Sequence, residues 1–240
     1  MSEHSARPAA RGRAYQLVVD HVEAQILDGR IKVGDRLPGE RELALRLEVS
    51  RAAVREGIRS LEAQGVVRSG VGSGPDAGTV VSALPSAALT RFLRLHVALA
   101  NFPIPDVVEA RVMLERSSAR LAAGHGDQER LGPVAEALAA MDDPTLDQAT
   151  FNALDTTFHI AIAEAGGNRL VSDITIAIRD AFRRPILEGL GLLGDRWPQA
   201  ATRLRAEHHA IYAALVDGDE TTAADLMEEH VRGAAQWLPG

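Results

Sequence analysis

Three histidines and one aspartate lie on or beside the apolar stripes of helices predicted in the second half of the sequence. Asp155 and His159 are four residues apart, so they project from one side of the same predicted helix. His208 and His230 fall on the apolar stripes of two later predicted helices. Because unpaired buried polar groups are costly, the four side chains should pair with one another as core residues or bind a metal ion. One carboxylate and three imidazoles suit Zn²⁺, Ni²⁺, Mn²⁺, Co²⁺ or Fe²⁺.

An inward-facing arginine is predicted nearby in the chain. Arg111 interrupts an apolar stripe that includes Val108 and Leu114, so its guanidinium should point into the helical core. It can make a structural ion pair with Asp106 or Glu115. Alternatively, its planar fork of N–H groups can bind the carboxylate of a small-molecule effector.

A second cluster of charge lies in the first third of the sequence, where arginines recur at every fourth position of one predicted helix. Like charges at this spacing destabilise a helix slightly, and an arginine at its start opposes the helix dipole. The alternative is an ordinary charged surface helix, but a DNA-recognition helix needs such side chains for phosphates and base edges. We therefore expect DNA contacts from the cap, the helix and the short helix before it: Arg41, Ser50, Arg51, Arg55 and Arg59.

The elements around the arginine helix predict a winged helix-turn-helix, an α+β domain, over residues 14–81. Three helical segments come first, and the third follows Ser50, a good N-cap. Two β-branched runs, 66–68 and 79–81, then flank a glycine-rich stretch and predict a hairpin. We expect the residues before this domain, 1–13, to form a flexible arm.

The remainder of the chain shows only helical periodicity after a linker at 82–86. We predict an all-α helical bundle of six or seven helices over residues 87–240, which provides both the metal site and the effector site. The helical segments are 86–100, 104–124, 127–141, 147–165, 168–191, 199–217 and 219–237.

Composition limits the classes of protein that remain. With no cysteine, the chain has neither disulfides nor thiolate metal ligands, which suits a reducing cytoplasm. It has no apolar run of about 18 residues that could span a membrane, and its start lacks the apolar region of a signal peptide. The net charge of −7 is uneven, because residues 1–81 hold 12 basic and 11 acidic residues and the rest hold 14 and 22. The first third is thus close to neutral, and the placement of its arginines matters more than their number.

Two segments of the first third, LPGERELA at 37–44 and VSRAAVREGIRSLEAQGVV at 49–67, closely resemble the DNA-binding domain of the GntR family. The resemblance covers about residues 14–81. It implies that Arg41, Arg51 and Arg55 contact operator DNA and that a glycine of the wing approaches the minor groove. The chain departs from the family at Gly39, where a small polar N-cap is usual, in a longer wing tip, and at Gly57, where alanine is usual. By helix propensity alone, the glycine at 57 should weaken the helix by ~1 kcal/mol.

The second part of the chain looks like the FCD ligand-binding domain of the FadR subfamily. The resemblance rests on Asp106-Val-Val-Glu-Ala-Arg111 with Leu114-Glu115, Asp155-x-x-Phe158-His159, Ala165-Gly-Gly-Asn168, Glu207-His208-x-Ala-Ile211 and His230. It implies a divalent metal held by Asp155, His159, His208 and His230, with a small organic acid beside it. It also implies that Arg111 assists in binding the acid.

These features predict a homodimeric transcription regulator, a repressor rather than an enzyme, that reads a palindromic operator and responds to a small mono- or dicarboxylate. One alternative is a regulator that senses an acyl-CoA without metal, which the complete histidine set argues against. Another is a metal-dependent hydrolase fused to a DNA-binding module, for which the sequence shows no second carboxylate in register. A third is a structural DNA-binding protein without a ligand.

Overall fold

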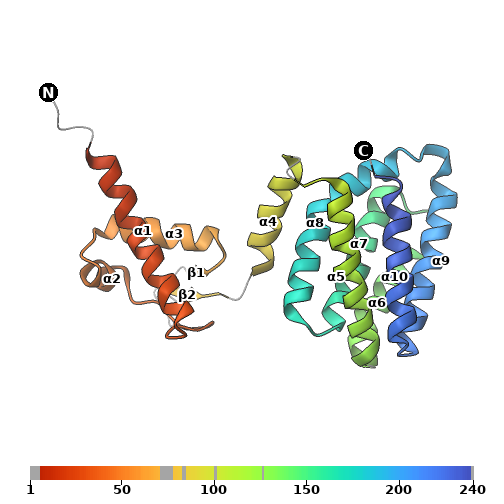
Figure 1. Ribbon diagram of the computed structural model, residues 1–240, viewed down its shortest axis with the longest axis horizontal. Helices are drawn as coiled ribbons and strands as arrows, with labels where there is room; N and C mark the ends of the chain where they lie inside the picture. Colours follow the sequence, from red (N-terminus) through yellow and green to blue (C-terminus); the bar gives the residue numbers. More distant parts are fainter. Residues whose placement is uncertain (1–5, 71–77, 83–84, 100–101, 126, 239–240) are drawn as a thin grey trace. The chain divides into compact units, whose positions relative to one another are not determined.

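The computed structural model describes residues 6–70, 78–82, 85–99, 102–125 and 127–238. It divides into two compact units, Met1–Ala88 and Leu89–Gly240 (Figure 1). The first unit combines three helices with a small antiparallel sheet, and the second is helical throughout its described residues. This confirms the predicted fold class.

The first unit is built from α1 (Ala6–Leu27), α2 (Glu40–Arg46), α3 (Arg51–Ala63), β1 (Val67–Gly70) and β2 (Gly78–Val81). Its core is formed by apolar residues of all three helices and both strands, including Val18, Leu43, Val54, Leu61 and Val81. Helix α1 begins earlier than the sequence predicted, so the arm expected at 1–13 is helical from Ala6 onward. The segment is rich in alanine and arginine, which are among the best helix formers.

The close packing of α1 on α3 explains one departure from the family pattern. A Cβ atom added at Gly57 would lie 2.8 Å from the Cβ and Cγ1 atoms of Val18 and 3.1 Å from the carbonyl oxygen of Tyr15. Alanine at this position would therefore push α1 away from α3. The glycine that helix propensity counts as a weakness is what lets the two helices approach.

The wing is a two-stranded hairpin in which Val67 pairs with Val81 and Gly70 with Gly78. A further bridge joins Arg36 to Val80 on the other side of β2. The sequence predicted a long wing tip. Residues 71–77 of that tip are not among the residues that the structure describes.

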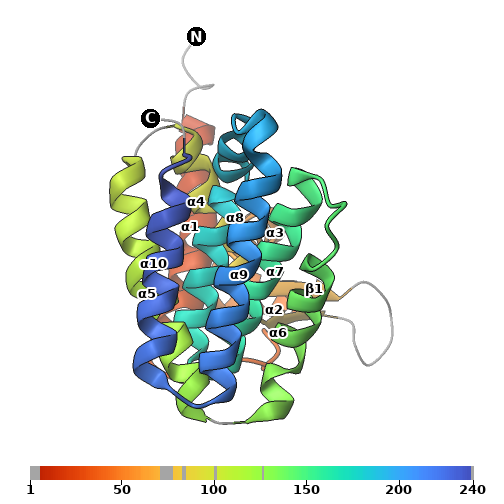
Figure 2. The same cartoon turned by 90° about the vertical axis from the view of Figure 1, so that its right-hand side faces the viewer.

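The second unit contains seven α-helices in the part of the chain that the structure describes, at the upper end of the predicted six or seven, and the first of them begins four residues before the unit boundary. They are α4 (Pro85–Ala98), α5 (Ile104–His125), α6 (Gln128–Met141), α7 (Gln148–Ala165), α8 (Arg169–Gly191), α9 (Trp197–Val216) and α10 (Glu220–Ala235), with a 3-10 turn η1 (Gly194–Arg196) before α9. Side-chain caps define several starts, including that of α8, where Asn168 Oδ1 accepts from the N–H of Val171. Helix α5 packs against α7, α8, α9 and α10, so side chains from these helices meet inside the bundle. Figure 2 shows α5 running beside α10.

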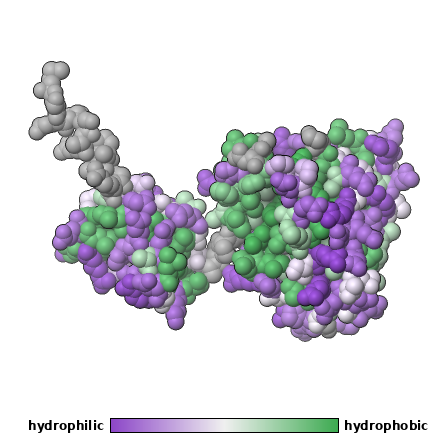
Figure 3. All heavy atoms as spheres, viewed as in Figure 1, coloured by the Kyte–Doolittle hydropathy of each residue, from purple (hydrophilic) through white to green (hydrophobic). Residues whose placement is uncertain are grey.

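Helix α4 carries an apolar face that the bundle leaves exposed (Figure 3). Phe92 and Leu95 on α4, Leu99 just after it and Met113 on α5 are each more than half exposed. Exposed apolar residues that gather on one helix, as Phe92 and Leu95 do, often mark a surface that another molecule covers. None of the described helices is long and apolar enough to cross a membrane.

Candidate metal and effector site and DNA-binding helix

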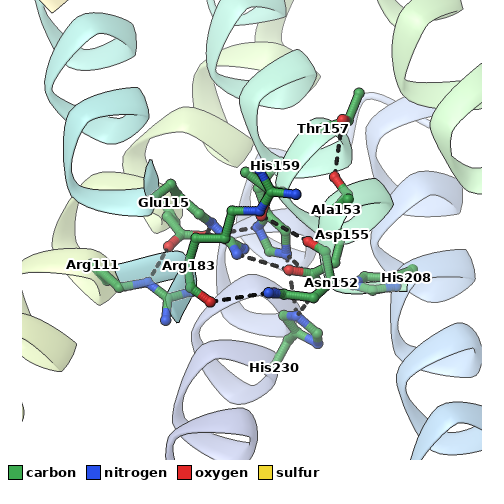
Figure 4. A network of polar contacts seen from close by, with 12 residues as sticks. Arg111, Glu115, Asn152, Ala153, Asp155, Thr157, His159, Arg183, His208 and His230 are labelled. Atoms are coloured by element: carbon green, nitrogen blue, oxygen red, sulfur yellow. Dashed lines mark hydrogen bonds and ion pairs between the residues drawn. The ribbon is translucent and has the colours of Figure 1, made fainter. Parts of the chain in front are cut away.

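The bundle brings together the aspartate and three histidines that the sequence singled out (Figure 4). Asp155 and His159 come from α7, His208 from α9 and His230 from α10. Asp155 Oδ1 lies 3.1 Å from His208 Nε2, 3.6 Å from His159 Nε2 and 3.9 Å from His230 Nε2. The Nε2 atoms of His159 and His230 are 3.2 Å apart. One oxygen and three nitrogens thus converge on one point.

Two carboxylates contact the Nδ1 atoms of histidines in the cluster, on the side of each ring opposite Nε2. Glu115 Oε2 of α5 lies 2.6 Å from His159 Nδ1. Glu207 Oε2 of α9 lies 2.8 Å from His230 Nδ1. Carboxylates on the far ring nitrogen orient metal-binding histidines and make them better ligands. The arrangement directs the Nε2 atoms of both rings toward Asp155.

A buried network of ion pairs surrounds the cluster. Arg179 of α8, which is 1% exposed, contacts Asp155 Oδ2 through Nη1 at 2.9 Å and Glu115 Oε2 through Nη2 at 3.0 Å. Arg111 Nε donates to Glu115 Oε1 at 2.8 Å, so one of the two ion pairs predicted for Arg111 is formed. The two arginines therefore balance the two buried carboxylates, Glu115 and Asp155.

The electrostatics keep the cluster in the form that a cation would bind. Burial raises the pKa of Asp155, but Arg179 and His159 outweigh burial and hold that pKa well below its usual value. Burial and the neighbouring His230 lower the pKa of His208 to about 4. Burial likewise lowers the pKa of His230. At neutral pH the carboxylate is charged and the rings of His208 and His230 are neutral, as metal ligands must be.

The donor set fits a divalent metal ion. In a tetrahedral site with bonds of about 2.1 Å, neighbouring ligand atoms lie about 3.4 Å apart. The distances from Asp155 Oδ1 to the three Nε2 atoms, 3.1 to 3.9 Å, bracket that value. Nε2 of the fully buried His208 lies 3.1 Å from the Asp155 carboxylate, and its Nδ1 has no hydrogen bond to any described residue. By contrast, the adjacent His209 is exposed and contacts Asp142, which supports the choice of His208 as the candidate ligand.

A small cavity of about 30 Å³ opens beside the cluster. Its polar lining consists of Arg111, Asn152, Asp155, Arg179 and His230. Its apolar lining comes from α7, α8, α9, the end of α10 and the residues just after α10: Phe151, Ile186, Leu190, Leu204, Ala234, Trp237 and Leu238. The cavity is therefore lined by both charged or polar groups and apolar side chains.

The arginines predicted to read DNA are exposed on the first unit. Ser50 caps α3 by accepting a hydrogen bond from the N–H of Ala53 at 3.1 Å, and Arg41, Arg51, Arg55 and Arg59 are all exposed. Carboxylates lie among them, because Arg55 Nε donates to Glu40 Oε2 at 2.8 Å. Arg59 pairs with Glu56 one turn earlier on α3. The arginine face thus carries acidic partners that an anionic ligand has to displace.

Sequence reasoning missed several members of the buried site. Arg179 could have been found, because it falls on the stripe of buried residues Ser172, Thr175 and Phe182, as Arg111 falls on its own stripe. The conclusion that no second carboxylate was in register with the metal ligands was wrong, since Glu115 and Glu207 both contact the cluster. They belong to other helices than Asp155, so spacing along one helix could not reveal them.

Comparison with known proteins identifies the family. Residues 14–75 match the gntR family of bacterial regulatory proteins, and residues 106–233 match the FCD domain. The chain is a GntR family regulator with an FCD domain. This confirms the resemblance found in the sequence.

Relatives of this GntR regulator include both transcriptional repressors and a transcriptional activator. The transcriptional repressor NanR of Salmonella schwarzengrund is 32% identical over 238 residues, covering 96% of this chain and 87% of the relative. NanR of Klebsiella aerogenes is 29% identical, covering 96% and 88%. The Glc operon transcriptional activator of Escherichia coli is 26% identical, covering 90% and 85%. The chain is therefore a transcription regulator rather than an enzyme.

A solved structure shows the same fold. The GntR protein of Streptococcus agalactiae aligns with 92% of this chain and 99% of its own, with a TM-score of 0.59 and 22% sequence identity. The match supports the fold of the chain.

Proposed function

We propose that this regulator is a homodimeric cytoplasmic repressor whose binding to a palindromic operator is controlled by a small organic acid at a metal centre in the FCD domain. Asp155, His159, His208 and His230 would hold a divalent ion. The observation that carries the proposal is the convergence of one carboxylate oxygen and three imidazole nitrogens beside a small cavity lined by two arginines.

Charge favours an anionic effector. Arg111 and Arg179 balance Glu115 and Asp155, and burial keeps the rings of His208 and His230 neutral. Adding a divalent ion leaves this buried set with about two positive charges, which attract an anion. When bound, the metal would supply an open position for a ligand oxygen. We infer that the effector is a mono- or dicarboxylate whose acid group meets the Arg111 guanidinium.

The volume of the cavity also limits the size of the effector. At about 30 Å³ it has room for about two water molecules, so the lining side chains must move apart for a compact acid to enter, and a long acyl chain beside the cluster would need a far larger rearrangement. The hydrolase alternative needs a free general base, but of the two described carboxylates behind the histidines Glu115 is engaged by Arg111, Arg179 and His159, and Glu207 by His230 and Arg203.

The exposed apolar face of α4 supports the homodimer. A second copy would cover Phe92, Leu95 and Leu99, and two recognition helices would then read two half-sites of a palindrome. The effector would regulate DNA binding by favouring one arrangement of the dimer over another.

The decisive experiment measures metal, acid and DNA on the same preparation. Tag-free wild type should carry about one transition metal ion per chain, and His208→Ala should carry none and melt at a lower temperature. An organic acid should release operator DNA from wild type but not from His208→Ala. His209→Ala is the matched control, because His209 is exposed and outside the cluster, and it should behave as wild type. Absence of every transition metal from protein never exposed to chelator would contradict the proposal.

A further inference from the structure

Asn152 is a buried polar residue of the cavity that the proposed metal site does not use. It is 1% exposed, lines the cavity and precedes Asp155 by three residues, so both lie on one face of α7. Its Nδ2 donates to the carbonyl oxygen of Arg183 on α8 at 3.0 Å (Figure 4). Because a carbonyl oxygen only accepts, this bond fixes which end of the amide is nitrogen.

The other end of the amide lacks a partner. Asn152 Oδ1 is buried and has no hydrogen bond to any described residue. A buried acceptor left unpaired destabilises a protein, so each such atom needs an explanation. The bond from Nδ2 to Arg183 explains why an amide helps to join α7 to α8. That bond does not explain why Oδ1 of Asn152, a residue that lines the effector cavity, has no hydrogen-bond partner.

The surrounding groups define what the oxygen can bind. Arg111 and Arg179 are hydrogen-bond donors that match a carboxylate, and a carboxylate has no proton to give to Asn152. An amine would supply a proton, but it would be a cation beside two arginines and a metal ion. A hydroxyl group and an amide N–H both supply a donor without charge, and the hydroxyl is the smaller of the two, which suits the small cavity. The ligand that satisfies all three side chains therefore carries both a carboxylate and a hydroxyl.

We propose that Asn152 is a specificity-determining residue that accepts a hydrogen bond from an effector hydroxyl, so that the pocket selects hydroxycarboxylic acids over the same acids without the hydroxyl. This inference rests on the proposed function, since it requires an acid in the cavity. The apolar wall formed by Ile186, Leu190 and Trp237 would contact the carbon skeleton of that acid.

The test compares matched pairs of acids by calorimetric titration of the metal-loaded full chain. The probes are lactate against propionate, malate against succinate, and 3-hydroxybutyrate against butyrate. Wild type should bind the hydroxylated member of at least one pair about 10- to 100-fold more tightly, the range expected when a buried acceptor gains or loses its partner. In Asn152→Leu, which removes the acceptor at similar size, that ratio should fall to about one.

The ratio separates recognition from structure. Asn152→Leu also loses the bond to Arg183, but this loss weakens both members of a pair alike. Thr175→Val is the matched control, because Thr175 Oγ1 is also buried without a hydrogen bond to a described residue, yet Thr175 does not line the cavity. It should keep the wild-type ratio. If Asn152→Leu does not fold, Asn152→Ala and Asn152→Thr take its place, and only the threonine, which retains an acceptor oxygen, should keep part of the preference.

The outcomes distinguish this inference from the proposed function. If wild type binds metal and acids but does not prefer the hydroxylated members, the role of Asn152 is wrong and the proposed function stands. If wild type prefers the hydroxylated acids and Asn152→Leu keeps the full preference, the metal ion and not Asn152 binds the hydroxyl group, and the role of Asn152 is again wrong. If wild type binds none of these acids while metal-loaded, the proposed effector class fails, and the inference fails with it.

Discussion

Glu115→Gln isolates the contribution of the buried ion-pair network, because it removes one charge and almost no volume. The carboxylate contacts Arg111 Nε at 2.8 Å, Arg179 Nη2 at 3.0 Å and His159 Nδ1 at 2.6 Å. Burial raises the pKa of Glu115, but Arg111 and Arg179 outweigh burial and keep the group ionised with a pKa well below its usual value. Neutralising it leaves two buried arginines facing the single carboxylate of Asp155.

Two magnitudes follow from these contacts. Breaking a buried ion pair by removing one partner costs about 3–5 kcal/mol, which for a domain of this size lowers the melting temperature by about 6–20 °C. Losing the carboxylate behind a metal-binding histidine weakens metal affinity by about 10- to 100-fold. The extra positive charge left in the network acts in the same direction, because it repels the metal ion.

The assay pairs calorimetric melting of the metal-free protein with a metal competition titration. Glu109→Gln is the matched control, because Glu109 lies on the same helix and contacts Arg232 through both carboxylate oxygens, but at the surface. An exposed pair contributes little, so this variant should melt and bind metal as wild type does. If Glu115→Gln behaved like Glu109→Gln in both measurements, the network would carry neither stability nor metal affinity, and our account of the site would be wrong.

Three further predictions test other parts of the molecule. Arg51→Ala and Arg55→Ala should each weaken specific operator binding by about 1–3 kcal/mol in a gel shift at fixed salt, with no change in melting temperature; unchanged binding would remove α3 as the recognition helix. Gly57→Ala should destabilise the first unit by about 1–3 kcal/mol in urea titrations, because the added methyl group overlaps Val18; stabilisation by about 1 kcal/mol would show that helix propensity decides instead. Arg111→Ala breaks the buried pair with Glu115 and should lower the melting temperature, but well below that temperature it should retain metal and DNA binding and lose the response to acids. Arg111→Lys should restore the response poorly, since a point charge does not replace a fork of donors; a normal response in the alanine variant would refute the role of Arg111.

Patterns within one helix could be predicted from the sequence. The helix boundaries in the second unit agree with the structure to within a few residues, because glycine and proline mark most of the ends. The inward positions of His208 and His230 followed from the apolar stripes on α9 and α10, and both are buried. These features depend on a period of 3.6 residues, which a single sequence displays directly.

Features that depend on contacts between helices could not be predicted in the same way. The spacing of Asp155 and His159 gives no information on which carboxylate lies behind the histidine, since Glu115 is 44 positions away from His159. The role of Gly57 depends on its contact with Val18 of another helix. Helix propensity alone therefore predicted only that the glycine weakens its own helix. Nothing in the sequence distinguishes Asn152 from other polar positions of α7. Only its bond to Arg183 in the structure shows which end of the amide remains unpaired.

The placement of the tryptophans gives the protein an intrinsic optical reporter. The chain contains two tryptophans, and both belong to the bundle. Trp237 lines the cavity, and Trp197 packs edge-on against Phe151, another lining residue, with ring centroids 5.3 Å apart. Ultraviolet-excited emission should therefore respond to a ligand entering the cavity, while DNA bound to the tryptophan-free first unit contributes no indole signal of its own. Effector screening can use the unlabelled protein, and the change on mutating each tryptophan to phenylalanine would show which ring senses the ligand.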